Sequence, residues 1–296
     1  MTAALATRGL GKRYGSRWAL SGCTLEVPAG HVAGLVGPNG AGKTTLLQLA
    51  VGLIEPSAGS IAVLGEEVAA TAAQLARVGF VAQDTPLYPS LSVADHLRLG
   101  AALNPSWDQA LAEARIARLG LDRAQRAGTL SGGQRAQLAL TLAIAKRPEL
   151  LVLDEPVASL DPLARREFLQ ALMEFTAEHT VTILLSSHLV ADLERVCDYL
   201  ILLAEGHVQL SGEVDELLTS HRRLSGPRRD ASRLPSSQQV IEETHTDRQS
   251  TLLIRTEEPI IDPAWTVEEV SLEDIVLAHM GRDRTHQPDA VPRVGR

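Results

Sequence analysis

Several residue types are scarce in this sequence, and each scarcity excludes a class of protein. Aromatic residues make up only 3% of the 296 residues, so the core implied by a hydrophobic content of 45% must be built mainly from Ala, Leu, Val and Ile. No stretch approaches the ~18 consecutive apolar residues that a membrane-spanning helix needs. If the protein acts at a membrane, another chain must therefore supply the spanning helices.

Cysteine and basic charge are also scarce. The two cysteines, Cys23 and Cys197, lie far apart in apolar surroundings, which predicts buried thiols in a reducing compartment rather than a disulfide framework or a metal site. The net charge of −8 and the pI of about 5.6 argue against a general nucleic-acid footprint, which would be basic. Residues 1–30 contain no continuous apolar stretch, so we expect no secretory signal.

Residues 37–45 match the pattern of a phosphate-binding loop, in which a Gly and four further residues precede Gly-Lys-Thr. An apolar strand predicted over 31–36 precedes the loop and a helix predicted from Leu46 follows it, which argues against the alternative of a glycine-rich turn that binds nothing. Glycines let consecutive backbone N–H groups converge on an anion, and the positive end of the helix dipole faces the same phosphates. The pattern predicts that Lys43 reaches the β- and γ-phosphates and that the Thr44 hydroxyl holds Mg²⁺. The predicted phosphate-binding residues are Gly37, Pro38, Asn39, Gly40, Ala41, Gly42, Lys43, Thr44 and Thr45.

The order of the predicted elements indicates an α/β fold with a P-loop NTPase core. Residues 1–30 alternate weakly between apolar and polar and predict antiparallel strands, whereas the apolar run at 150–153 is typical of a strand buried on both faces of a parallel sheet. We therefore expect a mostly parallel sheet with an antiparallel β subdomain, an α-helical subdomain and a small C-terminal α+β appendage. The predicted boundaries are 1–220 for the core domain with its helical subdomain at about 86–148, 221–238 for a linker, 239–280 for the appendage and 281–296 for a disordered tail.

Capping residues and composition place the helices and the linker. Ser92 with Asp95 predicts the start of a helix that ends near Leu103, and a second helix is expected to run from Ser106 to Gly120. A third, apolar nearly all round, follows Ser131-Gly132-Gly133 and should be buried. The arginines, prolines and serines of 221–238 favour a flexible linker. The appendage should hold three strands and a helix capped by Ser271, with the strands at 240–244, 251–256 and 265–270.

Two acidic residues, Asp154 and Glu155, end the strand predicted at 150–153. In a phosphate-loop NTPase a strand-end Asp holds Mg²⁺, and a Glu directly after it can polarise the attacking water, a role worth ~10²–10⁴ in rate. The alternative is a solvated pair of carboxylates. A buried apolar run that ends in two acids argues against it, because such charges need a cation or partner.

A second loop that opens a helix, Leu130-Ser131-Gly132-Gly133-Gln134, lacks a lysine. Its hydroxyl and backbone N–H groups can bind a γ-phosphate that is already held elsewhere. These five residues match the signature motif of the ABC-transporter ATPase family, which the chain resembles over about residues 3–220.

The resemblance implies roles for further residues, which follow one another in the order typical of the family. Gln83 stands where a glutamine contacts Mg²⁺ and senses the transmembrane partner, and Asp154 and Glu155 match the Walker B aspartate and the catalytic glutamate. Asp161 matches the D-loop, and His188 matches the histidine that touches the γ-phosphate. Taken singly, Gln83 could be any polar strand end and His188 a hydrogen-bonded core histidine, but their joint order argues against coincidence.

The resemblance also implies the ligands and the assembly. ATP and Mg²⁺ are the expected cofactors, and Tyr14 stands where the family stacks an aromatic ring on adenine, with Trp18 as a rival. Two such domains pack head to tail in this family, so Ser131 to Gln134 would act in trans, with Asp161 near the seam. The partner could be a second copy or a sister subunit.

Three functions fit a phosphate-loop ATPase, and the sequence favours the first. The first is that of the ATPase subunit of a transporter, which works at the cytoplasmic face of the membrane with a separate permease. The second is a soluble ABC ATPase acting on ribosomes or nucleic acid, which usually has two cassettes or a long coiled-coil insertion. The third transfers phosphate to a small substrate, but no acceptor site is visible. The segment 104–108 and the helix after Ser271 resemble bacterial exporter subunits, while import stays open.

Overall fold

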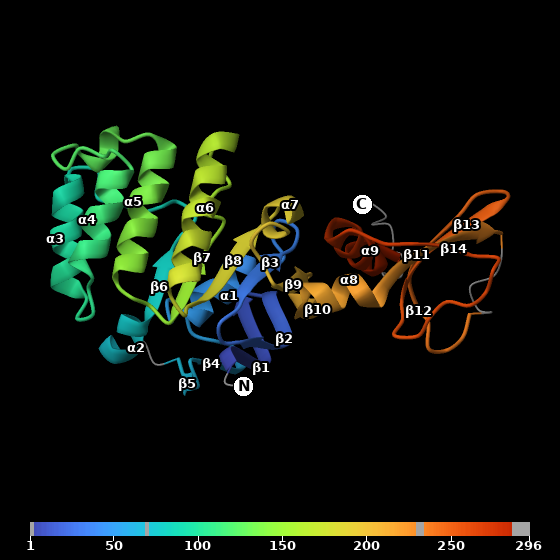
Figure 1. Cartoon of the computed structure of the whole chain (residues 1–296). Coiled ribbons are helices and arrows are strands. Elements are labelled where there is room, and N and C mark those ends of the chain that lie inside the picture. The colour runs from blue at the N-terminus through green and yellow to red at the C-terminus, as the bar shows by residue number, and fades with distance from the viewer. Residues whose placement is uncertain (1–2, 69–70, 229–233, 286–296) are drawn as a thin grey trace, which may run out of the picture. The chain divides into compact units, whose positions relative to one another are not determined.

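The described residues form three β-sheets, and the chain divides into two compact units (Figure 1). The computed structural model describes residues 3–68, 71–228 and 234–285. The N-terminal unit is Met1–Ser211 and the C-terminal unit is Gly212–Arg296. The predicted domain boundary at residue 220 lies beyond this division, because the helix α8 (Val214–Ser220) groups with the C-terminal unit.

The central sheet of the N-terminal unit has the strand order β10-β9-β3-β8-β7-β6. β3 pairs in parallel with β8 and β9, and β7 pairs in parallel with β6 and β8. Every residue of β3, β7 and β8 is buried, as expected for strands covered on both faces. The strands span β3 (Val32–Val36), β6 (Val78–Val81), β7 (Leu150–Leu153), β8 (Thr182–Ser187), β9 (Tyr199–Ala204) and β10 (His207–Glu213).

The parallel direction of these strands brings their following loops to one edge of the sheet. The phosphate loop follows β3, Gln83 follows β6, Asp154 follows β7 and His188 follows β8. Ligands of open α/β sheets bind at this carboxyl edge, so four predicted site segments gather there through topology alone.

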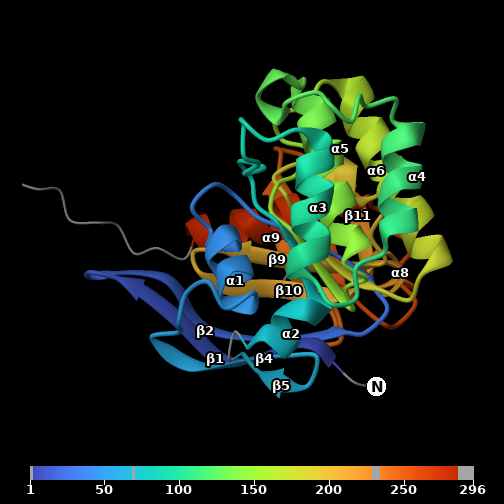
Figure 2. The same cartoon turned by 90° about the vertical axis from the view of Figure 1, so that its left-hand side faces the viewer.

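An antiparallel sheet with the order β2-β1-β4-β5 forms the predicted β subdomain. The helix α1 (Lys43–Ala50) lies next to it (Figure 2), and its residues Leu46, Leu47 and Leu49 are fully buried in one apolar cluster with residues of both sheets. Burial of these leucines fixes the helix that begins at the phosphate loop. The strands span β1 (Ala3–Tyr14), β2 (Arg17–Pro28), β4 (Ala58–Val63) and β5 (Glu66–Glu67).

The helical part of this unit has its own apolar cluster, which includes Val93, Leu97, Ile116 and Leu138. As predicted, Ser92 and Asp95 form a capping box. The helices are α3 (Val93–Leu103), α4 (Gln109–Arg118) and α5 (Gly132–Ala145), with α6 beside α5 (Figure 1). The remaining helices of the unit are α2 (Ala72–Arg77), the short 3₁₀ helix η1 (Ala127–Thr129), α6 (Pro162–Glu178) and α7 (Val190–Leu193).

The predicted start of the second helix at Ser106 is wrong. α4 begins at Gln109, because the Asp108 carboxylate accepts from the Leu111 N–H at 2.8 Å and so caps the helix. Asp108 also forms an ion pair with Arg147. Trp107 lies outside the helix and packs on Gly100, where an added Cβ would stand 2.5 Å from the indole ring. The segment 104–108 therefore connects α3 to α4 and contacts the residues that follow α5.

The C-terminal unit contains an antiparallel sheet of order β12-β13-β11-β14. Leu224, Leu252, Ile254 and Trp265 form its apolar core. As predicted, Ser271 caps the last helix, since its hydroxyl accepts from the Asp274 N–H at 3.1 Å. The elements span β11 (His221–Pro227), β12 (Gln239–His245), β13 (Gln249–Arg255), β14 (Thr266–Glu268) and α9 (Leu272–Thr285).

Two boundaries predicted for this unit are wrong. Residues 221–227 are not a linker but the strand β11, which pairs with β13 from His221↔Arg255 to Pro227↔Gln249. The arginine-rich composition is misleading here because the strand is anchored by two fully buried residues, His221 and Leu224, and by its backbone pairing. Residues 281–285 belong to α9, which continues to Thr285, and not to the predicted disordered tail. Residues 229–233 and 286–296, where the rest of the predicted linker and tail fall, lie outside the described part of the chain.

Both cysteines are free and buried, as predicted. Burial raises the pKa of the Cys197 thiol strongly and that of Cys23 less, so neither is a reactive thiolate. No helix in the described ranges is long and apolar enough to cross a membrane.

Candidate nucleotide site

The phosphate loop joins β3 to α1 with backbone groups that leave no room for side chains. Gly42 is the N-cap of α1 in the left-handed conformation (φ 105°), and no side chain caps the helix. A Cβ on Gly42 would stand 2.6 Å from the Ala19 carbonyl oxygen, and one on Gly37 would stand 2.0 Å from that of Leu203. The N–H groups at the start of α1 therefore remain available to an anion, beside the positive end of the helix dipole.

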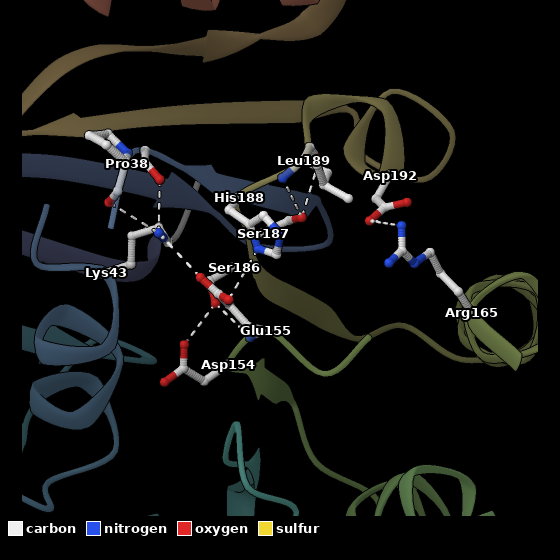
Figure 3. A network of polar contacts seen from close by, with 11 residues as sticks. Pro38, Lys43, Asp154, Glu155, Arg165, Ser186, Ser187, His188, Leu189 and Asp192 are labelled. Carbon is white, nitrogen blue, oxygen red and sulfur yellow. Dashed lines mark hydrogen bonds and ion pairs between the residues drawn. The ribbon is translucent and has the colours of Figure 1, made fainter. Parts of the chain in front are cut away.

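Lys43 lies under the loop and is 5% exposed. Its ammonium group donates to the carbonyl oxygens of Gly37 at 2.8 Å and Pro38 at 3.3 Å. The Glu155 carboxylate lies 3.3 Å from the same nitrogen (Figure 3). These contacts hold a buried cation at the loop, as a phosphate site requires.

Glu155 connects Lys43 to His188. One carboxylate oxygen faces the ammonium, and the other lies 3.2 Å from Nδ1 of His188. The backbone of Glu155 is left-handed (φ 44°), a conformation that is strained for a residue other than Gly. Its N–H donates to the Ser186 hydroxyl at 2.8 Å, which helps to hold this turn in place. The arrangement places a carboxylate that can accept a proton next to the phosphate loop.

Asp154 is 1% exposed and accepts a hydrogen bond of 2.8 Å from the Ser186 hydroxyl. With Thr44 and Gln83 it offers carboxylate, hydroxyl and amide oxygens, the donor types that suit Mg²⁺. Across the described residues there is no group of three or more His, Cys, Asp or Glu side chains that could hold a metal on its own. A donor set of this kind fits Mg²⁺, which typically takes few protein ligands and shares phosphate oxygens.

A pocket of about 800 Å³ opens above the phosphate loop. It brings together most predicted site residues, namely Tyr14, Asn39, Gly40, Ala41, Gly42, Lys43, Thr44, Thr45, Gln83, Glu155 and His188. The volume suits a small ligand of nucleotide size. Asp154 lies behind this lining, and Gly37 and Pro38 contribute their carbonyl groups to Lys43.

Sequence reasoning missed three lining residues, Arg17, Ala19 and Ala158. Arg17 is the cross-strand partner of Tyr14 at the tip of the β1–β2 hairpin. The antiparallel strands predicted over 1–30 contained part of this signal, because the two-residue turn at Gly15 and Ser16 places Tyr14 and Arg17 opposite each other.

The pocket also separates the two aromatic candidates for adenine. Tyr14 is 50% exposed and lines it, whereas Trp18 is not among its lining residues. The Arg13 guanidinium lies over the Trp18 ring at 5.5 Å, and the Lys12 ammonium lies 5.5 Å from the Tyr14 ring centre. Geometry therefore favours Tyr14 as the stacking surface.

The predicted signature residues lie outside this pocket. Ser131, Gly132, Gly133 and Gln134 open α5, and Ser131 and Gln134 form a capping box with hydrogen bonds of 2.9 and 3.1 Å. Asp161 is exposed and caps α6, accepting from the N–H groups of Leu163 and Ala164 at 3.0 Å each. Within one chain these residues do not contact the phosphate loop site.

Comparison with known proteins places this geometry in a family. The ABC transporter family model matches residues 20–158. The aliphatic sulfonates import ATP-binding protein SsuB of Pseudomonas putida is 40% identical over 213 residues, which cover 71% of this chain and 77% of that protein. The Nod factor export ATP-binding protein I of Cupriavidus pinatubonensis is 37% identical over 228 residues, 74% of this chain and 69% of that protein.

Solved structures give the same result. An ATP-binding subunit of an ABC transporter aligns with a TM-score of 0.65 at 30% identity, covering 73% of this chain and 92% of that one. CbiO1 from Clostridium perfringens, part of the cbiONQ complex, aligns with a TM-score of 0.63 at 27% identity and covers 74% and 92%. With the phosphate loop, the acidic strand end and the signature loop in one fold, the chain belongs to the ATP-binding subunits of ABC transporters, a family of ATPases.

Proposed function

We propose that this subunit hydrolyses ATP with Mg²⁺ and couples ATP-driven dimerisation to transport through a separate permease. The observation that carries the proposal is the Glu155 carboxylate, which lies 3.3 Å from Lys43 and 3.2 Å from His188 at the wall of the pocket. A base beside the phosphate loop is what hydrolysis needs, because the attacking water must lose a proton.

Each lining residue has a proposed role. Lys43 and the N–H groups of Gly40 to Thr45 bind the phosphates, and Tyr14 stacks on adenine. Glu155 polarises the attacking water, and His188 contacts the γ-phosphate while it orients Glu155. Lys43 exchanges its contact with Glu155 for phosphate oxygens when ATP binds, which frees the carboxylate for the water.

Thr44, Gln83 and Asp154 are the residues we propose to hold Mg²⁺. When bound, the ion would offset charge on the phosphate oxygens. The hydrogen bond from the Ser186 hydroxyl orients the Asp154 carboxylate for the proposed contact with Mg²⁺. Gln83 follows β6 and lines the pocket. A change in its contacts when nucleotide binds can therefore be passed to the segment that follows it, which is the proposed contact with the permease.

We propose that a second chain completes the site, either another copy or a sister subunit. Ser131 to Gln134 are solvent-accessible at the start of α5 and lie outside the pocket of their own chain. Their hydroxyl and N–H groups would bind the γ-phosphate held by the partner, with Asp161 at the seam.

The segment from Gln83 to His96 is the proposed contact with the permease, at the cytoplasmic face of the membrane. Tyr88 is 61% exposed there, and its N–H donates to Nε2 of the buried His96 at 3.1 Å. An exposed ring on a fixed backbone suits an anchor for a loop of a partner protein. Replacing Tyr88 with Ala should release a co-purifying permease and leave ATP binding unchanged.

For the direction of transport we propose export. Support comes from the resemblance of 104–108 to exporter subunits and from the Nod factor export relative. Import is a second candidate, favoured by the aliphatic sulfonates import relative at 40% identity. Inverted membrane vesicles that contain the co-purified permease distinguish them, since ATP drives an exported substrate into such vesicles and an imported one out.

The Glu155→Gln variant tests hydrolysis. It keeps the side-chain volume and removes the base, so it should bind ATP, accumulate as a nucleotide-bound dimer and lose about 10²-fold or more of turnover. Size exclusion with ATP and a phosphate-release assay measure both. The exposed Glu26→Gln on β2 is the matched control and should behave like the parent chain. Normal turnover in Glu155→Gln would refute the assigned role.

A further inference from the structure

Arg17 is a cation of the nucleotide pocket that the phosphate-loop motif does not account for. It lines the pocket from the tip of the β1–β2 hairpin, where it pairs across the turn with Tyr14. Its side chain is exposed, and it forms no hydrogen bond or ion pair with any other described residue. Its neighbours are engaged, since Lys12 donates to the Glu55 carbonyl and Arg13 lies over Trp18.

The guanidinium of Arg17 points at the phosphate loop. Its Nη2 atom is the nearest atom to the position of a Cβ on Gly40, at 4.0 Å. Gly40 lies in the middle of the loop whose N–H groups face the pocket, and β2 brings Arg17 to it from a segment more than twenty residues earlier in the chain. The part of a bound nucleotide closest to Arg17 is therefore its phosphate chain rather than a base stacked on Tyr14.

The charges of the pocket favour the same contact. Three lining residues carry full charges, namely Arg17, Lys43 and Glu155. Lys43 and Glu155 lie 3.3 Å apart and offset each other, whereas Arg17 is the lining cation that has no acidic partner among the described residues. A planar guanidinium with several donors matches phosphate oxygens well.

We propose that Arg17 is a second phosphate-binding cation of the nucleotide site, one that ATP and ADP both engage. The β1–β2 hairpin then supplies two complementary surfaces, the Tyr14 ring for the base and the Arg17 guanidinium for the phosphates. Because the contact requires no γ-phosphate, Arg17 retains the product ADP as well as the substrate. This inference depends on ATP binding and holds whatever is transported.

A ligand series tests the proposal on the full chain. Arg17→Ala should weaken ADP and ATP binding about tenfold each, the scale of one charge-assisted hydrogen bond, while adenosine binding stays within about twofold of the parent. Arg17→Lys keeps the positive charge but lacks the planar guanidinium with its several donors, so its loss of ADP and ATP affinity should be smaller. Calorimetry measures ADP and ATP, and ligand-observed NMR measures adenosine. Affinity for ADP should also fall less steeply with salt in Arg17→Ala.

Arg13→Ala is the matched control, because it removes an arginine from the same hairpin that does not line the pocket. It should leave all three affinities within about twofold of the parent. Thermal unfolding of both variants should match the parent, since both side chains are exposed. Unchanged ADP affinity in Arg17→Ala would overturn the proposal, and so would an equal loss for adenosine, which would place Arg17 on the base or the ribose.

Discussion

The two glycine-containing loops of the N-terminal unit both open a helix, but they leave different groups free. At α1 the N-cap is Gly42, no side chain caps the helix, and the first N–H groups are available. At α5 Ser131 and Gln134 bond to each other's backbone N–H groups. The Ser131 oxygen accepts from Gln134, so its hydroxyl proton remains to donate. One loop is thus an open anion cradle, and the other is a rigid, capped surface that offers a single hydroxyl and the glycine N–H groups.

This difference explains the different roles that we propose for the two loops in ATP binding. An open helix terminus with a buried lysine can bind phosphate within one chain. A capped terminus holds its shape without a ligand, so it can complete a site that another chain has already filled. Two loops of similar composition therefore need not bind the same ligand independently.

The largest expected effect comes from placing a methyl group in each loop. Gly42→Ala should weaken ATP binding about a hundredfold, because φ is 105° and the new Cβ would meet the Ala19 carbonyl at 2.6 Å. Gly132→Ala should leave ATP binding by the single chain within about twofold, since its Cβ would find the nearest atom at 4.0 Å. Calorimetry on both variants measures this. Equal losses would contradict the division between the loops.

A smaller effect separates capping from phosphate binding. Ser131→Ala should lower the free energy of unfolding by about 1 kcal/mol through loss of the cap, and Ser92→Ala should do the same at α3, where the same capping box is present. Only Ser131→Ala should also reduce ATP hydrolysis, by about tenfold, because only its hydroxyl would reach a partner's phosphate. Urea unfolding and phosphate release distinguish the two. Equal activities of the two variants would argue that the α5 terminus is structural.

The effect with the least expected influence on nucleotide binding lies outside both loops, in the C-terminal unit. Burial lowers the pKa of His221, and Arg222 and Arg255 act in the same direction, while Nδ1 lies 2.8 Å from the Leu217 carbonyl. Nε2 of His221 lies 3.4 Å from Nε2 of His279 on α9. The unfolded chain therefore binds a proton more readily than the folded unit. Stability should fall as the pH drops below about 6.5, by at most about 1.4 kcal/mol per pH unit.

His221→Gln should flatten that pH dependence and leave nucleotide affinity unchanged. Trp265 reports on the C-terminal unit, so its fluorescence in urea should be followed in a chain with Trp18→Phe and Trp107→Phe. The parent should lose stability between pH 7 and pH 5.5, and the variant should not. A change in ATP affinity in His221→Gln would show that the two loops are sensitive to this unit, against our expectation.

Local chemistry made much of the fold predictable. The apolar run at 150–153 is typical of a buried strand, and Ser92, Ser131 and Ser271 indicated the helices that they cap. The predictions were wrong where contacts with residues distant in sequence outweighed the local composition. The strand β11 is rich in arginine, and its pairing with β13 and β14 makes it a strand. Similarly, Asp108 rather than Ser106 caps α4, because its carboxylate accepts from the Leu111 N–H and is held by an ion pair with Arg147.

Short stretches of the sequence specify the chemical groups of this protein: a phosphate loop, an acidic strand end, a signature loop and the order in which they follow one another. Local patterns encode these because each depends on residues that are close in sequence. Which of these side chains contact one another depends on the tertiary structure. Parallel pairing of β3, β7 and β8 brings Lys43, Glu155 and His188 within contact distance, and the β1–β2 hairpin carries Arg17 to Gly40. Such contacts depend on strand order and register, which no local stretch of residues specifies.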